Sequence, residues 1–263
     1  MPWGSLRVGW WAPLWLPAVF TASFALAQVG ADKRRSGYQD MGPALQKMQD
    51  DDTANPGMLF VQLGEQLWGK PAGAANKACA DCHTVAAMKG VATRYPAMIK
   101  DAGDRPIDLE GRIRLCRTAN QQAEPWAPES RDLLSVAAFV ARQSRGLPIT
   151  PPDDSRLASF REQGAAIWGR RQGQLNLSCA ICHDDNAGKK LAGVTIPEAH
   201  PTGYPIYRLE WQALGSLKRR LRNCLVGVRA EAYLYDALEY VALEVFLMDR
   251  AKGMLFESPG VRP

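Results

Sequence analysis

Cys79–His83 reads Cys-Ala-Asp-Cys-His and Cys179–His183 reads Cys-Ala-Ile-Cys-His, and this five-residue pattern decides the fold. C-x-x-C-H is typical of c-type heme attachment, because the two thiols form thioethers with the porphyrin and the histidine that follows binds the iron. The sequence therefore predicts two covalently bound heme c groups. The expected attachment residues are Cys79, Cys82, Cys179 and Cys182, and the expected proximal iron ligands are His83 and His183.

The second motif follows the first by 100 residues, from position 79 to position 179, and other segments repeat with it. Gly64–Lys70 (GEQLWGK) aligns with Gly164–Arg170 (GAAIWGR) at the same offset, and the Tyr-Pro pair at 95–96 resembles the pair at 204–205. A repeat of this length indicates a duplicated domain rather than a solenoid unit.

Apolar residues recur at helical spacing in both halves, and no alternating run is long enough to build a sheet. One stripe contains Leu109, Ile113 and Cys116, and the corresponding stripe contains Leu214, Leu217, Leu221 and Cys224. We therefore predict an all-α chain of two tandem class I cytochrome c-like domains related by internal duplication. Their expected bounds are 28–147 and 148–263, with a proline-rich linker at 146–154.

The first 27 residues resemble a secretory signal peptide. Arg7 precedes an apolar stretch at 8–25, and the small-x-small pattern Ala-Leu-Ala at 25–27 marks a cleavage site. We expect a cleaved, periplasmic protein, where heme attachment to C-x-x-C-H takes place. The alternative is an uncleaved anchor, which Pro13 and Pro17 disfavour. Nothing after residue 30 is apolar for long enough to span a bilayer, so we expect no stable membrane insertion.

The formal net charge of +5 is mild. It argues against a nucleic-acid-binding protein, which needs a concentrated basic face, but it permits attraction of small anions or of an acidic partner.

Cys116 and Cys224 are left unassigned, and we expect both to bind the distal positions of the irons. They follow the two histidines at 33 and 41 residues, from 83 to 116 and from 183 to 224, and each lies on its apolar stripe. The open alternatives are Met88 or Met98 for the first iron and His200 or water for the second iron. A Cys116–Cys224 disulfide and two inert buried cysteines are the non-catalytic interpretations.

Basic residues gather around the second of these cysteines, namely Lys218, Arg219, Arg220, Arg222 and Arg229. Arg220 precedes Cys224 by four residues and so lies on the same face of a helix. A guanidinium group holds an oxyanion through paired charge-assisted hydrogen bonds, which indicates an anionic substrate. The alternative is that these arginines neutralise heme propionates, and Arg112 stands in the same relation to Cys116.

These segments together resemble the SoxA family, the diheme cytochromes of the SoxAX complex of bacterial sulfur oxidation. The resemblance covers nearly the whole chain after residue 27. It depends on the two C-x-x-C-H modules and on the segments at 112–117 (RIRLCR), 121–126 (QQAEPW), 220–224 (RLRNC) and 228–231 (VRAE).

The resemblance implies the activity, the partners and the site. A SoxA-like chain pairs with a SoxX-like monoheme cytochrome c and joins thiosulfate to a cysteine of the SoxYZ carrier, releasing two electrons. It implies that Cys224 is the catalytic heme ligand, carried as a persulfide, and that Arg220 binds the substrate. It also implies that His83 and Cys116 bind the first iron.

Two other functions remain open at this stage. A simple diheme electron-transfer cytochrome would use methionine ligands, and no methionine lies between His183 and the final helix. A diheme thiosulfate dehydrogenase would form tetrathionate and would need no carrier protein.

Overall fold

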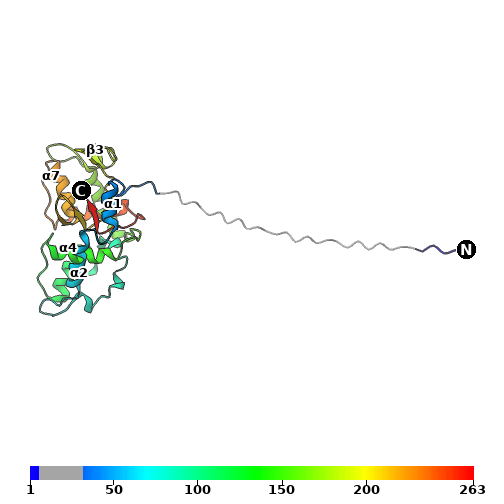
Figure 1. Cartoon of the computed structure of the whole chain (residues 1–263), viewed down its shortest axis with the longest axis horizontal. Helices are drawn as coiled ribbons and strands as arrows, with labels where there is room; N and C mark the ends of the chain where they lie inside the picture. The colour runs from blue at the N-terminus through cyan, green and yellow to red at the C-terminus, as the bar shows by residue number, and fades with distance from the viewer. Residues whose placement is uncertain (6–31) are drawn as a thin grey trace. The chain divides into compact units, whose positions relative to one another are not determined.

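The computed structural model describes residues 1–5 and 32–263. The predicted signal peptide, residues 1–27, falls almost entirely on residues 6–31 and so lies outside the described residues. All helices and strands belong to one structural unit, Arg34–Pro263, and its elements are labelled in Figure 1.

The N-terminal half is built on the packed pair α2 (Gly57–Trp68) and α4 (Arg131–Arg142). The hydroxyl of Ser130 caps α4 by accepting a hydrogen bond from the backbone of Leu133. All nine residues at 133–141 are buried, so α4 is the central helix of this half.

The C-terminal half repeats this pair with α5 (Ala158–Gly169) and α8 (Leu238–Arg250). The α8 helix buries seven of its residues, among them Tyr240, which has no exposed surface.

A glycine at the same place in α2 and in α5 lets each helix pair approach closely. A Cβ atom on Gly64 would lie 2.1 Å from the carbonyl oxygen of Ser135, and one on Gly164 would lie 2.2 Å from that of Ala242. The aligned glycines of the sequence repeat are therefore helix-crossing points, because no larger residue fits there.

Two further helices carry the unassigned cysteines. The α3 helix (Leu109–Cys116) ends on the first cysteine and begins at the Asp108 cap, and α7 (Leu217–Gly227) contains Cys224 and begins at the Ser216 cap. The remaining helical segments are α1 (Pro43–Asp50), α6 (Cys179–His183), the 3-10 helices η1 (Cys79–Asp81), η2 (Ala86–Met88), η3 (Ala92–Arg94), η4 (Lys100–Ala102) and η6 (Ser155–Leu157), and the π-helix η5 (Arg117–Gln121).

Short strands accompany the helices, so the expectation of an all-α chain is confirmed only in part. The strands are β1 (Ala97–Met98), β2 (Pro106–Ile107), β3 (Lys190–Leu191), β4 (Val194–Thr195), β5 (Ile206–Arg208), β6 (Ala213–Gly215) and β7 (Gly260–Arg262). β1–β2 and β3–β4 are antiparallel pairs. In the third sheet β5 lies between β6, which is antiparallel to it, and β7, which is parallel. Runs of two or three residues are too short to leave an alternating pattern in the sequence.

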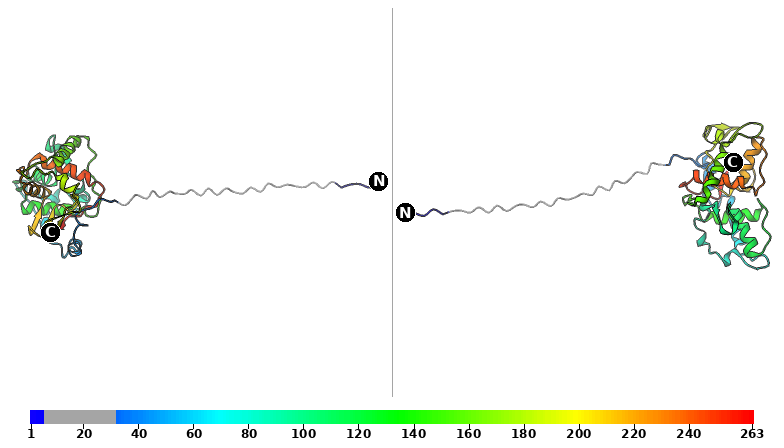
Figure 2. Two further views of the ribbon diagram at one scale, coloured as in Figure 1. Left: turned by 90° about the horizontal axis from the view of Figure 1, so that it is seen from above. Right: turned by 180° about the vertical axis from the view of Figure 1, so that it is seen from behind.

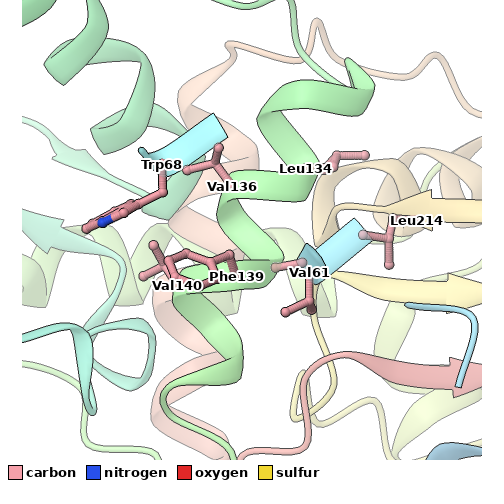
Figure 3. Packing of buried hydrophobic residues seen from close by; sticks show 8 residues of the cluster. Val61, Trp68, Leu134, Val136, Phe139, Val140 and Leu214 are labelled. Carbon is pink, nitrogen blue, oxygen red and sulfur yellow. The ribbon is translucent and has the colours of Figure 1, made fainter. Parts of the chain in front are cut away.

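The two halves share their cores. Leu214 of β6 joins the cluster formed by α2 and α4, and Figure 3 shows it on the side of that cluster opposite Trp68. A second cluster combines Ala141 and Ile149 with Met248 and Phe256. In the right view of Figure 2 the red end of the chain lies between the yellow-green and the cyan-green parts of the fold.

Across the described ranges 1–5 and 32–263, no helix combines the length and the apolar character that crossing a membrane requires.

Candidate heme sites

A cavity of about 460 Å³ opens in the N-terminal half, and the first C-x-x-C-H motif lines it. The residues that line the cavity include Cys79, Cys82, His83, Met88 and Cys116. The volume falls within the range of about 300–1,000 Å³ that is typical of cofactor sites. Because the cavity brings together two thiols, an imidazole and a further sulfur ligand, the residues present fit a covalently attached heme.

The motif loop is held against the end of the cysteine-bearing helix. Backbone amides at 74 and 75 donate to the carbonyl oxygens of Gln122 and Gln121. The buried Gln121 side chain donates to the carbonyl oxygen of Lys77 at 2.9 Å and lies 3.9 Å from the sulfur of Cys79. The second half repeats this contact, because amides at 174 and 175 donate to the carbonyl oxygens of Arg229 and Val228.

A buried tryptophan packs on each proximal histidine. The rings of Trp68 and His83 have centroids 6.1 Å apart, and those of Trp168 and His183 are 5.7 Å apart. Both indoles are less than 8% exposed, so these tryptophans are packing residues. The indole N–H of Trp168 also donates to Asp184 at 2.7 Å.

Cys116 lies near Cys79 in the first site. Burial raises the pKa of the Cys79 thiol, and the negative charge of Cys116 in its thiolate form adds to this rise. Met88 borders the same cavity, whereas Met98 lies in β1, outside its lining. Cys116 and Met88 therefore stay in competition for the first iron, and the case for Met98 is weakened.

The second site brings Cys224 to the proximal histidine. The ring of His183 lies within hydrogen-bonding reach of the Cys224 sulfur. Its other nitrogen, Nδ1, donates to the carbonyl oxygen of Pro197 at 2.7 Å. A carbonyl on Nδ1 fixes the tautomer and leaves Nε2 for an iron, as in most histidine-ligated metal sites. The donor set of an imidazole and a thiol therefore fits a heme here too.

Positive charge surrounds the Cys224 sulfur. Burial opposes ionisation most strongly, but the contact with His183 and the charges of Arg220 and Arg208 together lower the pKa of the thiol. Burial raises the pKa of neighbouring Cys179 to about 11, with Cys224 as the next cause. The two thiols thus differ in acidity, and Cys224 is the one whose environment favours the thiolate.

Arg220 is the predicted basic residue that acts on Cys224, and several of its neighbours do not. Lys218 pairs with Asp108, and Arg222 donates to the carbonyl oxygen of Tyr233. Arg219 stacks over Trp211 with its guanidinium carbon 4.2 Å from the ring centroid. Three members of the basic run are therefore engaged with other groups.

Arg208 of β5 was missed by sequence reasoning. Its guanidinium carbon lies 5.1 Å from the ring centroid of Trp211, which Arg219 also contacts, and its side chain is 14% exposed. It precedes Cys224 by 16 positions, from 208 to 224, and reaches the site only through the β5–β6 hairpin. No pattern in the sequence relates the two residues.

Two alternatives to the cysteine ligands are weakened. His200 contacts the carbonyl oxygen of Arg35 at 2.9 Å and Glu198 at 3.6 Å, whereas the histidine in contact with Cys224 is His183. All six cysteines of the chain are free, so Cys116 and Cys224 do not form a disulfide.

Comparison with known proteins adds to this geometry. The cytochrome c domain of SoxA/TsdA matches the chain twice, over residues 63–149 and 163–256. The L-cysteine S-thiosulfotransferase subunit SoxA of Pseudaminobacter salicylatoxidans is 36% identical over 88% of this chain and 82% of its own length. The subunit of the same name from Rhodovulum sulfidophilum is 34% identical over 88% of this chain and 81% of its own length.

A solved structure gives the same result. The crystal structure of SoxXA from P. pantotrophus matches with a TM-score of 0.84 at 28% identity, over 88% of this chain and 87% of that chain. The chain therefore has the cytochrome c fold.

Proposed function

The chain belongs to the SoxA/TsdA cytochrome c family, and on this basis we propose that it is a diheme L-cysteine S-thiosulfotransferase subunit. It conjugates thiosulfate oxidatively to a cysteine of a SoxYZ carrier in sulfur oxidation. One observation carries this assignment to the C-terminal half, namely that Cys224 lies against His183 with Arg220 and Arg208 lowering the pKa of its thiol.

The reaction removes two electrons from two sulfur compounds. The sulfur of a carrier thiol forms an S–S bond with the outer sulfur of thiosulfate, which keeps its sulfonate group. One proton and two electrons are released. Two covalently bound heme c groups, when present, each accept one electron at a time.

The residues of the second site divide the work between sulfur and charge. Cys224 offers the sulfur that forms an S–S bond to the outer sulfur of thiosulfate as two electrons are removed. The carrier thiolate then attacks that outer sulfur, takes the intact thiosulfate group and releases Cys224; the persulfide form of Cys224 is part of the proposal. Arg220 binds the oxyanion through charge-assisted hydrogen bonds, and Arg208 adds positive charge. Such a pocket lowers the free-energy cost of bringing a dianion to a thiolate.

The first site serves electron transfer. We assign Cys79 and Cys82 as its thioether residues and His83 and Cys116 as its iron ligands; the corresponding assignments in the second half are Cys179, Cys182, His183 and Cys224. The lining of the first cavity by Arg112 and Arg117 suits the heme propionates.

The halves 28–147 and 148–263 are proposed as domains that arose by internal duplication. The matched helix pairs, the matched glycine contacts and the two family matches support this origin. Export to the periplasm with cleavage after residue 27 is part of the same proposal. The SoxX-like monoheme cytochrome is its heterodimer partner, since the matched crystal structure is that of SoxXA.

Thiosulfate dehydrogenase remains the second candidate, because the matching family model covers TsdA as well as SoxA. The two activities differ in their acceptor. The deciding experiment incubates the holoprotein and its SoxX-like partner with thiosulfate and an electron acceptor, with and without a SoxYZ carrier. We expect a carrier adduct by mass spectrometry, with little tetrathionate; tetrathionate formed at the same rate without carrier would contradict the assignment.

A further inference from the structure

The two cysteine-bearing helices are joined at their N-terminal ends by a buried ion pair. Oδ1 of Asp108, the cap of α3, accepts a hydrogen bond from the backbone of Gly111 at 2.8 Å. Its Oδ2 pairs with the ammonium group of Lys218, in the first turn of α7. Asp108 is 1% exposed and the Lys218 side chain 12%. Among the described residues, Lys218 is the single polar partner of this carboxylate oxygen.

Two more carboxyl groups adjoin this pair, Glu110 of α3 and Glu244 of α8. Both line a cavity of about 40 Å³ together with Tyr95 and Tyr204. This volume exceeds the roughly 10–15 Å³ that one water molecule needs, so the cavity has room for water beside both side chains. Within residues 32–263 neither glutamate has an ion-pair partner of its own.

The charges of this cluster balance only if protons are bound. Lys218 supplies one positive charge, and Asp108, Glu110 and Glu244 supply three carboxyl groups. The Asp108–Lys218 pair is neutral by itself, so ionising either glutamate would leave an uncompensated buried negative charge.

A fourth carboxyl group faces Glu110 from the loop before α4. Glu129 accepts a hydrogen bond from the hydroxyl of Ser216, the cap of α7, and lies near Arg219. Its charge adds to the cost of ionising Glu110.

Burial and like charge act in the same direction on both cavity glutamates. Burial, followed by the charge of Asp108, raises the pKa of Glu110 to about 8 against the opposing charge of Lys218. Burial, followed by Asp108 and Glu110, holds the pKa of Glu244 well above its ordinary value.

The cavity lies between the two heme sites. Tyr95 and Leu109 line both this cavity and the cavity that contains Cys116. Tyr204 lines it from the other half and interacts electrostatically with Arg220 and Cys224.

We propose that Asp108, Glu110, Lys218 and Glu244 form a proton-binding site between the two halves, in which Glu110 exchanges its proton with water of the cavity. The carboxylic acid O–H bond of Glu110 breaks, the proton passes to water, and no electron moves. This site does not depend on the proposed sulfur chemistry.

Proton release has two consequences. It leaves a negative charge between the heme sites, which makes reduction of either site less favourable. It also changes stability. Because the pKa of Glu110 is raised on folding, the native state keeps a proton that the unfolded chain loses near pH 4.5, so stability falls as pH rises from about 4.5 to about 8.

The test compares the holoprotein with Glu110→Gln, which imitates the protonated acid. Glu239→Gln is the matched control, because Glu239 is an exposed glutamate of α8. Between about pH 5 and about pH 8, the ratio of the unfolding equilibrium constant of the unmodified protein to that of Glu110→Gln should rise about tenfold for each pH unit. Glu239→Gln should follow the unmodified protein.

Two further measurements separate proton binding from a merely structural role. Infrared spectra of the unmodified protein should show protonated carboxyl absorption at pH 7 and lose part of it near pH 8, and Glu110→Gln should lack the part that titrates there, while the absorption of Glu244 remains. The reduction potentials of both hemes should fall across the same pH window in the unmodified protein and less in Glu110→Gln.

Parallel unfolding profiles in the unmodified protein and Glu110→Gln would overturn the proposal, as would the absence of a protonated carboxyl band at pH 7. If Glu110→Gln does not fold, Glu244→Gln replaces it in the infrared titration, and the carboxyl absorption that titrates near pH 8 should remain in that variant; its loss would overturn the proposal.

Discussion

The two halves hold their proximal histidines alike and differ in what surrounds the remaining cysteine. In both, a buried tryptophan packs on the histidine and the motif loop is held to the cysteine-bearing helix. In the first half Cys116 borders a cavity that also admits Met88. In the second half Cys224 lies within hydrogen-bonding reach of His183, and this contact together with the charges of Arg220 and Arg208 lowers the pKa of its thiol. The proposed function accordingly places electron transfer at the first site and the reactive sulfur at the second.

The largest expected effect separates the two cysteines. Cys224→Ala should lower the rate of carrier conjugation at least about a thousand-fold, because the group that accepts sulfur is gone. Cys116→Ala should keep most of the conjugation and change the properties of the first heme. The measurement is the rate of adduct formation by mass spectrometry, with both hemes still attached. Equal losses in the two variants would erase the proposed division between the halves.

The next effect concerns the arginines of α7. Arg220→Ala should lower kcat/KM for thiosulfate by about 100-fold, since charge-assisted hydrogen bonds of about 1.5–3 kcal/mol are lost. Arg219→Ala is the matched control, because Arg219 stacks on Trp211. Steady-state kinetics with varied thiosulfate gives the comparison. Similar losses would indicate general positive charge in place of a specific contact.

A third prediction tests the close helix crossings that the two halves have in common. Gly64→Ala and Gly164→Ala should each lower the free energy of unfolding by about 2 kcal/mol, because the new Cβ would overlap a backbone carbonyl of the partner helix. Denaturant unfolding of each holoprotein measures it. Gly69→Ala is the control, since only one atom, at 4.0 Å, lies near its Cβ position. A loss at one crossing only would show that the helix pairs are not equivalent.

The smallest effect concerns the tryptophans. Trp168→Phe should lower the free energy of unfolding by about 1 kcal/mol more than Trp68→Phe does. The reason is that, among the described residues, only the indole of Trp168 has a protein hydrogen-bond partner. The carboxylate of Asp184 accepts this bond, and the matching position of the first half, 100 residues earlier, is occupied by Thr84. Thermal unfolding of both variants provides the difference. Equal costs would mean that ring packing alone matters.

The sequence predicted the parts of the molecule that local patterns determine. The two C-x-x-C-H motifs and the 100-residue offset located both histidines and the matching helices α2 and α5, because spacing and helical periodicity are visible along one chain. Arg220 was predicted because it lies one helical turn from Cys224.

What the sequence did not reveal depends on contacts between distant segments. Arg208 reaches Cys224 through a hairpin, and Lys218, which the sequence places with the arginines, turns to Asp108 at the end of the other cysteine-bearing helix. The short strands were not predicted for a different reason, since two or three residues are too few to show an alternating pattern.

Electron paramagnetic resonance of the oxidised protein tests most directly whether the Cys224 sulfur occupies the outer face of the iron bound by His183. The account predicts low-spin thiolate-type signals from both irons and the loss of one of them in Cys224→Ala, with the other unchanged. A spectrum that Cys224→Ala leaves as it was would contradict it.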